Sequence, residues 1–301
     1  MINHHPQWGP PVGWSRFAYA EYVTNTLYLC NSVMLFEALH RLGSKPDRLM
    51  MYPSAFLQDE KDDSTEPTAS QGTGRIWSQA DADRGAKSRQ GSSATWADSY
   101  TKLLAFNQTQ YDRVLSLDSD STILQTMDEL FFSPPSPVAM PRAYWLNFSD
   151  RILSSQLILV RPTNFEFNRI LKAISEAGNT DYDTEIVNNL YRDSALILPH
   201  RPYDILTGEF RSKRHTDYLG NPLESWDPVA AFQEAKFLHF SDWPFPKSWI
   251  AASPATVEEK QPTCDLNINI SSDGLSSHDL TNFSFLENET TLRQKLLGSK
   301  K

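Results

Sequence analysis

The chain has 301 residues, 40% hydrophobic and 22% charged, which is enough for one α/β domain with a full core. Its formal net charge of −9 excludes an extended nucleic-acid-binding surface, because such a surface needs excess Lys and Arg to neutralise phosphates. Cys30 and Cys264 are the only cysteines, too few for a zinc site or a disulfide framework. We expect no signal peptide and no membrane-spanning helix, which needs roughly 20 apolar residues in a row.

Composition divides the chain into regions. Residues 1–13 are polar and proline-rich and are expected to form a flexible N-terminus, and residues 14–252 are expected to form the folded domain. Within that domain, residues 57–93 are rich in Asp, Ser, Gln, Gly and Arg and show no periodicity, so we predict disorder or replaced sequence there. Residues 253–301 are again polar and are expected to be mobile.

The first folded segment predicts a strand, a helix and a second strand. Residues 17–23 are typical of a strand, residues 27–42 have helical periodicity, and Gly43 ends that helix. Residues 48–52 form the next strand, which Pro53 ends. This order predicts parallel pairing with a right-handed crossover. After residue 94 the pattern predicts helices at 99–106, 164–177 and 183–191, and strands at 111–117, 137–141, 152–160, 195–198 and 236–240.

The strand at 111–117 runs directly into Asp118-Ser119-Asp120. Side chains two residues apart on an extended segment point the same way, so the two carboxylates are expected to meet at the carboxyl end of the strand. Open α/β sheets place their ligands there. Paired carboxylates suit Mg²⁺ or Mn²⁺ carrying a substrate phosphate, although Asp and Ser are also ordinary turn residues.

Three ordered blocks then resemble a known family. Residues 101–120 follow the pattern T-K-L-x-x-[WF]-x-x-T-Q-Y-x-x-[VC]-x-x-x-D-x-D, residues 23–36 look like a first strand and nucleotide-binding turn, and residues 236–249 are close to an H-F…K-P-W closing block. Together they resemble glycosyltransferase family 8, the glycogenin group of retaining nucleotide-sugar transferases. The stretches YLCNSVMLFE, LSSQLILV and LPHRPYDILTGEF look most like its fungal branch, which includes N-acetylglucosaminyltransferases.

The resemblance implies an α/β, Rossmann-like GT-A fold with a mainly parallel central sheet. Members usually have a helix and a further strand where this chain has residues 57–93, so the sheet is expected to lack one strand. The resemblance makes Asp118, Asp120 and His239 the metal ligands. An imidazole favours Mn²⁺ over Mg²⁺. The alternative for His239 is a core histidine with a satisfied hydrogen bond.

Roles for the donor, a UDP-sugar, also come from the resemblance. Thr24, Asn25 and Tyr28 would bind the nucleotide, with Tyr28 stacking on uracil, and Lys247 would contact the diphosphate. The residues expected near the phosphates and the transferred sugar are Lys102, Asp183 and Gln156. Two of these positions keep an ordinary alternative, since Tyr28 could be a core aromatic and Lys102 a solvated helix residue.

The expected function is metal-dependent transfer of a hexose or N-acetylhexosamine from a UDP-sugar to a glycan or glycoprotein acceptor, with retention of configuration. Two alternatives stay open: a glycogenin-like primer that glucosylates itself, and a non-catalytic remnant of the family. The resemblance implies the Golgi or the secretory pathway, and the lack of a recognisable signal leaves the cytoplasm as the alternative.

Overall fold

The computed structural model describes residues 12–52, 74–78, 100–178, 180–241, 247, 250 and 253–256, with only the backbone course for 26, 27 and 74–78. Most of the predicted flexible N-terminus and nearly all of the predicted mobile tail lie outside these residues. Within the described residues, no helix combines the length and the apolar character that crossing a membrane would require.

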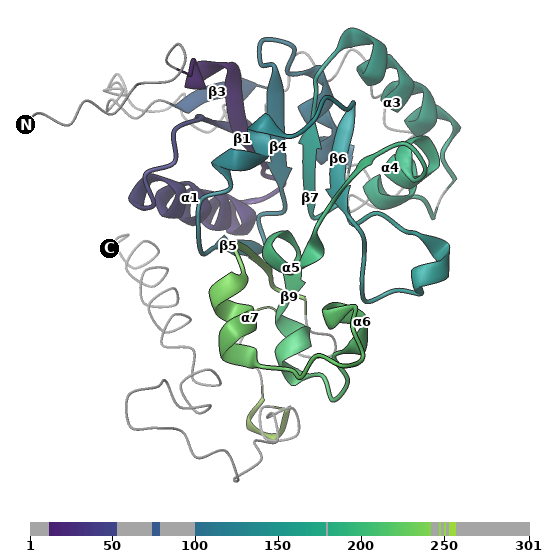
Figure 1. The fold of residues 1–301 in the computed structure, drawn as a ribbon. Helices are drawn as coiled ribbons and strands as arrows, with labels where there is room; N and C mark the ends of the chain where they lie inside the picture. The colour runs from purple at the N-terminus through teal and green to yellow at the C-terminus, as the bar shows by residue number, and fades with distance from the viewer. Residues whose placement is uncertain are drawn as a thin grey trace, which may run out of the picture.

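A seven-stranded sheet forms the centre of the domain, in the order β3-β2-β1-β4-β7-β6-β8 (Figure 1). β1 lies parallel to β2 on one side and to β4 on the other, whereas β7 runs antiparallel to β4 and β6. The sheet is therefore mainly parallel, as expected. Its strands are β1 (Phe17–Tyr22), β2 (Asp47–Tyr52), β3 (Gly74–Ser78), β4 (Arg113–Leu117), β6 (Val138–Pro141), β7 (Leu157–Val160) and β8 (Leu196–Leu198).

Strand β3 lies inside residues 57–93, for which the sequence predicted disorder or replaced sequence. The structure pairs Gly74–Ser78 in parallel with β2 at the edge of the sheet, so this short part of the segment has regular structure. An edge strand needs a partner on one side only, so a short segment with Ile76 and Trp77 can join the backbone ladder without a long apolar pattern. The rest of 57–93 lies outside the described residues.

Two hydrophobic clusters cover the two faces of the sheet because successive strand residues point to opposite sides. In β1, Ala18 and Ala20 pack on the face covered by the 3-10 helix η4 (Thr101–Asn107) and the helices α3 (Asn164–Glu176) and α4 (Asp183–Tyr191). Phe17 and Tyr19 pack on the other face. That face carries helix α1 (Thr26–Arg41) and the 3-10 helix η5 (Asp128–Phe132). The result is a three-layer α/β arrangement.

A second, three-stranded sheet was not predicted as such. It consists of β5 (Ser121–Ile123), β10 (Phe237–His239) and β9 (Ile205–Leu206), in that order. A third apolar cluster, with Tyr218 and Leu238 buried in it, packs the small sheet against nearby helices. The remaining short helices are η1 (Trp14–Arg16), η6 (Phe148–Asp150), α5 (His200–Tyr203), η7 (Thr207–Arg211), α6 (Thr216–Leu219) and α7 (Pro228–Glu234).

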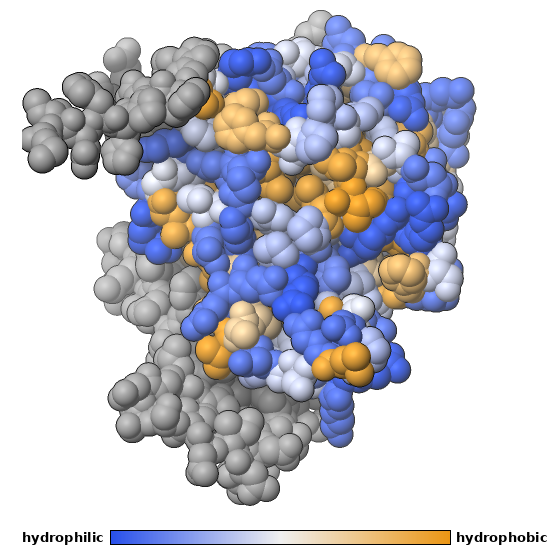
Figure 2. All heavy atoms as spheres, viewed as in Figure 1, coloured by the Kyte–Doolittle hydropathy of each residue, from blue (hydrophilic) through white to orange (hydrophobic). Residues whose placement is uncertain are grey.

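The small sheet positions the site. β10 pairs antiparallel with β5, and His239 stands opposite Ser121 in that pairing. Because β5 directly follows Asp118-Ser119-Asp120, the pairing brings the late His239 next to the early acidic pair. In the view of Figure 1, hydrophobic residues gather over the middle of the large sheet and are bordered by hydrophilic ones (Figure 2).

Candidate active site

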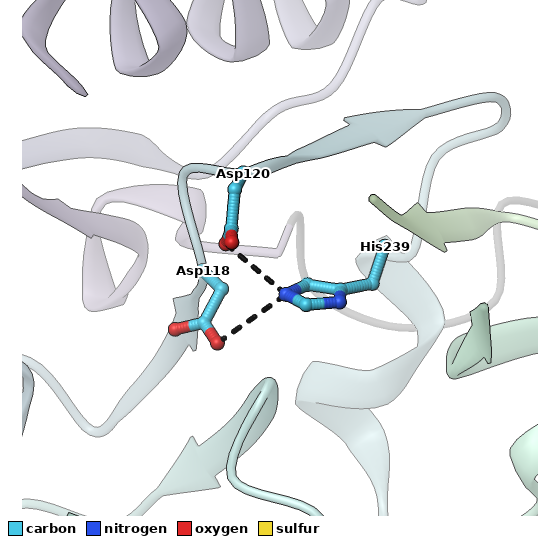
Figure 3. A group of neighbouring side chains, drawn as sticks. All are labelled: Asp118, Asp120 and His239. Carbon is cyan, nitrogen blue, oxygen red and sulfur yellow. Dashed lines mark hydrogen bonds and ion pairs between the residues drawn. The ribbon is translucent and has the colours of Figure 1, made fainter. Parts of the chain in front are cut away.

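The acidic pair and the late histidine meet, as predicted (Figure 3). One ligand atom from each of Asp118, Asp120 and His239 can be chosen so that all lie within 4.8 Å of one another. His239 Nε2 lies 3.1 Å from Asp120 Oδ1 and 3.7 Å from Asp118 Oδ2. His239 is 6% exposed, so the group is nearly closed to solvent on the imidazole side.

Backbone hydrogen bonds fix the turn that presents the carboxylates. The Asp118 N–H donates to the Gln156 carbonyl at 3.0 Å, and the Phe240 N–H donates to the Asp120 carbonyl at 2.9 Å. The Ser121 hydroxyl donates to the Asp118 carbonyl. Both ends of the turn are therefore held by residues that directly flank β7 and β10, so the turn is not an isolated loop.

Each carboxylate divides its two oxygens in the same way. Asp118 accepts from Lys102 through Oδ1, with Nζ at 2.6 Å, and turns Oδ2 toward His239. Asp120 pairs with Lys247 through Oδ2 at 2.8 Å and turns Oδ1 toward His239. Each aspartate thus keeps one oxygen on the side where a cation shared with the imidazole would lie. Lys247 also donates to the Phe240 carbonyl.

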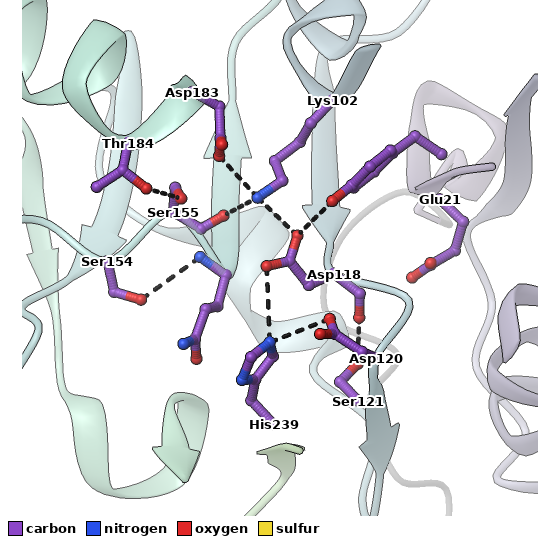
Figure 4. A network of polar contacts seen from close by, with 12 residues as sticks. Glu21, Lys102, Asp118, Asp120, Ser121, Ser154, Ser155, Asp183, Thr184 and His239 are labelled. Atoms are coloured by element: carbon purple, nitrogen blue, oxygen red, sulfur yellow. Dashed lines mark hydrogen bonds and ion pairs between the residues drawn. The ribbon is translucent and has the colours of Figure 1, made fainter. Parts of the chain in front are cut away.

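Lys102 is surrounded by protein acceptors (Figure 4). Its Nζ lies 2.6 Å from Asp118 Oδ1, 2.9 Å from Asp183 Oδ2 and 2.9 Å from the Ser155 carbonyl oxygen. An ammonium group has three N–H donors, so these contacts account for all of them. The side chain is 3% exposed, so it is not a solvated helix residue. The predicted contact with donor phosphate would require one of these bonds to be exchanged.

Charge and burial oppose each other at these groups. Burial raises the pKa of Asp118, although the Lys102 ammonium acts against that rise. Burial also acts to raise the pKa of Asp120, but His239 and Lys247 outweigh it and hold that pKa well below its usual range. The pKa of Lys102 is raised, because Asp118 and Asp183 outweigh the effect of burial. The ion pairs therefore favour the charged forms of Asp120 and Lys102, whereas at Asp118 burial outweighs its partners.

The metal expected from the sequence fits this donor set. Ligands that share one ion at roughly 2.1 Å each lie up to about 4 Å apart, so small side-chain adjustments would suffice here. Carboxylate oxygens together with an imidazole nitrogen suit Mn²⁺. His239 Nδ1 is buried without a hydrogen-bond partner among the described residues, so Nε2 is the nitrogen that faces the carboxylates.

The predicted nucleotide residues lie at the start of α1. Asn25 Oδ1 accepts from the Tyr28 N–H at 3.2 Å, the contact of a helix N-cap. Burial raises the pKa of the Tyr28 hydroxyl, and the charges of Asp120 and Asp118 raise it further. Thr24 is half-buried just beyond β1, on the same edge.

Gln156, just before β7, and Asp183, at the start of α4, reach the same region. Gln156 Oε1 is buried and has no hydrogen-bond partner among the described residues. Asp183 is bound to Lys102, so the structure joins it to the metal-ligand candidates through one ammonium group. Nearby, the Ser155 and Thr184 hydroxyls lie 2.7 Å apart.

Sequence reasoning missed Tyr22 and two buried acids. The Tyr22 hydroxyl donates to Asp118 Oδ1 at 3.2 Å. Glu21 and Asp204 are fully buried, and burial, followed in each by the nearby charge of Asp118, raises both pKa values well above the ordinary range, although a Ser hydroxyl lowers each in part. A glutamate inside an apolar strand was a usable signal for Glu21. No local sequence pattern indicated Asp204. This residue directly follows α5, and it lies near the site only because of the tertiary fold.

Comparison with known proteins decides the family. The chain is 57% identical over 263 residues to glucose N-acetyltransferase 1 of Gibberella zeae, and 45% identical over 269 residues to glucose N-acetyltransferase 1 of Aspergillus fumigatus. Each alignment covers 84% of this chain, with 57% of the first relative and 70% of the second. The chain belongs to the glucose N-acetyltransferase 1 family. It spans a little over half the length of its Gibberella zeae relative.

The fold of this glucose N-acetyltransferase 1 family member also has a solved counterpart. The bifunctional glycosyltransferase WbbM, in its apo structure, superimposes with a TM-score of 0.56 at 12% identity, covering 80% of this chain and 48% of WbbM. That likeness concerns the fold alone, and it confirms the GT-A arrangement expected from the sequence. No protein-family model matches the chain, so membership of glycosyltransferase family 8 stays a prediction.

Proposed function

We propose that the chain is a metal-dependent, retaining glycosyltransferase of family 8 type that moves a sugar from a UDP-sugar to a glycan or glycoprotein acceptor. The convergence of Asp118, Asp120 and His239 at the carboxyl end of β4 carries this proposal. The GT-A fold and the family's transferase name support it. Because the relatives' name joins glucose with an N-acetyl group, we take N-acetylglucosamine as the transferred sugar, with glucose as the alternative.

Asp118, Asp120 and His239 would hold Mn²⁺, or Mg²⁺ in its place. When bound, such an ion neutralises the negative charge that develops on a diphosphate leaving group. Lys247 can add to this effect, because its side chain is 32% exposed and can turn from Asp120 toward a phosphate. Lys102 is buried, and we assign it to holding Asp118 and Asp183 in place.

Gln156 and Asp183 are proposed to bind the transferred sugar. A buried acceptor without a partner is costly, so Gln156 Oε1 is suited to a hydroxyl or amide N–H that arrives with the donor. Tyr28, Thr24 and Asn25 would bind the nucleotide from the start of α1. Each of these contacts places a substrate group without requiring proton transfer from the residue.

Mn²⁺-dependent UDP binding tests the proposal most directly. Calorimetry should show UDP binding to the wild type with Mn²⁺, little binding in EDTA, and loss of the Mn²⁺ effect in Asp120→Asn. Asp150→Asn, a change at an exposed aspartate, is the matched control and should bind like the wild type. Equal UDP affinity in Asp120→Asn and the wild type would contradict the metal role.

The sugar and the alternatives need separate measurements. Release of UDP should be faster from UDP-N-acetylglucosamine than from UDP-glucose, and acetyl coenzyme A with glucose serves as the control reaction suggested by the relatives' name. A rise in the intact mass on incubation with UDP-glucose alone would favour the self-glucosylating alternative. Binding of UDP with no release from either donor would favour the non-catalytic alternative. For location, we propose the secretory pathway, most simply the Golgi, on the family resemblance alone.

A further inference from the structure

A cavity lies at the opposite end of strands β1 and β4 from the candidate active site. Its volume is about 410 Å³, and it is lined by residues at the start of β1, at the start of β4 and just after β7, together with part of η5 and the segment after it. The lining residues are Arg16, Phe17, Asp112, Arg113, Phe131, Pro135 and Arg161. Arg113 precedes Asp118 by the length of β4, roughly 16 Å at about 3.3 Å per residue. The cavity is therefore separate from the proposed metal site.

The charge in this cavity is unbalanced. Three arginines line it, and Asp112 is the only carboxylate among the lining residues. Asp112 forms an ion pair with Arg16, so it is already engaged. Arg161 forms no ion pair within the described part of the chain, and neither does Arg113. The surplus positive charge stands out in a chain whose formal net charge is −9.

Arg113 also has an unused donor. Its Nη2 donates to the Pro134 carbonyl at 3.2 Å, but Nη1 is buried and has no hydrogen-bond partner among the described residues. Burial lowers the pKa of Arg113, and the nearby charge of Arg161 lowers it further, although the carboxylate of Asp112 acts in the opposite direction. Asp112 is shared with Arg16, so a partly desolvated guanidinium beside Arg161 would still gain from a further anion at its unpaired Nη1.

The other side of the cavity is apolar. Phe17 and Phe131 are buried, and their rings stack at 5.2 Å between centroids with an interplanar angle of 25°. Pro135 adds a further apolar surface to the lining. A ligand that pairs an anionic group with a flat or apolar body would satisfy both parts of the lining.

We propose that this cavity binds an oxyanion, a phosphate or a carboxylate, held between Arg113 and Arg161, with an attached ring resting on Phe17 and Phe131. Planar guanidinium groups bind both oxyanions through paired hydrogen bonds. The proposal is independent of the proposed transferase activity, because none of its residues belongs to the metal or donor site. The chain would then bind an anionic ligand here in addition to the UDP-sugar proposed for the metal site.

Calorimetry on EDTA-treated protein at constant ionic strength tests this with three probes: inorganic phosphate, phenyl phosphate and benzoate. We expect phenyl phosphate to bind more tightly than inorganic phosphate, because only the former reaches the aromatic side. Stronger binding of benzoate than of phenyl phosphate would show that the site prefers a carboxylate to a phosphate as its oxyanion. No saturable heat from any probe in the wild type would overturn the proposal.

Arg161→Ala is the decisive variant, because Arg161 is exposed and its loss should leave the fold intact. We expect it to weaken phenyl phosphate binding at least tenfold, and Arg161→Lys to weaken it less. Arg192→Ala, a change at another exposed arginine, should bind like the wild type. Unchanged affinity in Arg161→Ala would reject the site, and thermal unfolding of each variant verifies that it is folded.

Discussion

Lys102 Nζ lies 2.6 Å from Asp118 Oδ1 and 2.9 Å from Asp183 Oδ2. One buried ammonium group thus joins a metal-ligand candidate at the end of β4 to a sugar-binding candidate on α4. Because Lys102 is nearly closed to solvent, removing its ammonium group would leave both carboxylates without their shared cation. The relationship makes Lys102 a positioning residue for two parts of the proposed site.

Replacing this lysine should cost stability as well as activity. Lys102→Met keeps much of the side-chain volume but leaves Asp118 and Asp183 without their shared cation, so we expect a loss of about 3–5 kcal/mol in the free energy of unfolding. Urea unfolding measures it. Lys172→Met, at a lysine whose side chain is 74% exposed, is the control and should change stability by less than about 0.5 kcal/mol.

A double variant separates the charge effect from lost packing. In Lys102→Met with Asp183→Asn, one of the stranded carboxylates is also neutralised, so the loss of stability should be smaller than the sum of the two single losses. Strict additivity would show that the two side chains do not interact in solution.

His239 should contribute to metal affinity. His239→Ala removes one of three proposed ligands, and we expect Mn²⁺ to bind roughly 10–100-fold more weakly. Electron paramagnetic resonance of free Mn²⁺ at increasing protein concentration measures this affinity. His40→Ala, at an exposed position on α1, should leave it unchanged. If His239→Ala bound Mn²⁺ as tightly as the wild type, His239 would be a core histidine and not a metal ligand.

Buried acids should make the metal-free protein less stable as the pH rises. Asp204 is fully buried, and its pKa is raised well above the ordinary 3.8 by burial and by Asp118. The folded state keeps this proton while the unfolded state releases it above about pH 4, so stability is full below that pH and falls between there and the raised pKa. Glu21 acts in the same direction.

Asp204→Asn isolates one of these acids. The wild type should lose up to about 1.4 kcal/mol per pH unit for each such group, and the variant should lose correspondingly less. Urea unfolding in EDTA from pH 5 to pH 8 gives the two slopes. Asp217→Asn, at an exposed aspartate, should keep the wild-type slope. Parallel curves for Asp204→Asn and the wild type would mean that Asp204 is ionised in the folded protein.

Asn188 should support the segment that leads to Gln156. Its Oδ1 accepts from the Leu153 N–H at 2.8 Å, and its Nδ2 donates to the Leu153 carbonyl at 3.0 Å. Asn188→Ala leaves both buried backbone groups unpaired, so we expect a loss of about 2–4 kcal/mol. The neighbouring Asn189 is exposed, and Asn189→Ala should have little effect. Equal losses in the two variants, measured by thermal unfolding, would contradict this role.

Local patterns in the sequence were enough for most of the individual elements. The apolar run of β1, the helical periodicity of α1 and α3, and the strand before Asp118 all follow from short-range patterns. The structure places these elements within a few residues of the predicted ranges. The direction of Asp118 and Asp120 toward one side also follows from strand geometry. The assignment of His239 came from the family resemblance.

Contacts between distant segments were decided only by the tertiary structure. β3 depends on the ladder of β2 and not on its own pattern, and the three-residue strands β5 and β10 gain their pairing only after the chain has folded back. The burial of Asp204 and the three acceptors of Lys102 arise in the same way. A sequence shows what each residue can bind, whereas hydrogen-bond partners and burial depend on which segments the core brings together.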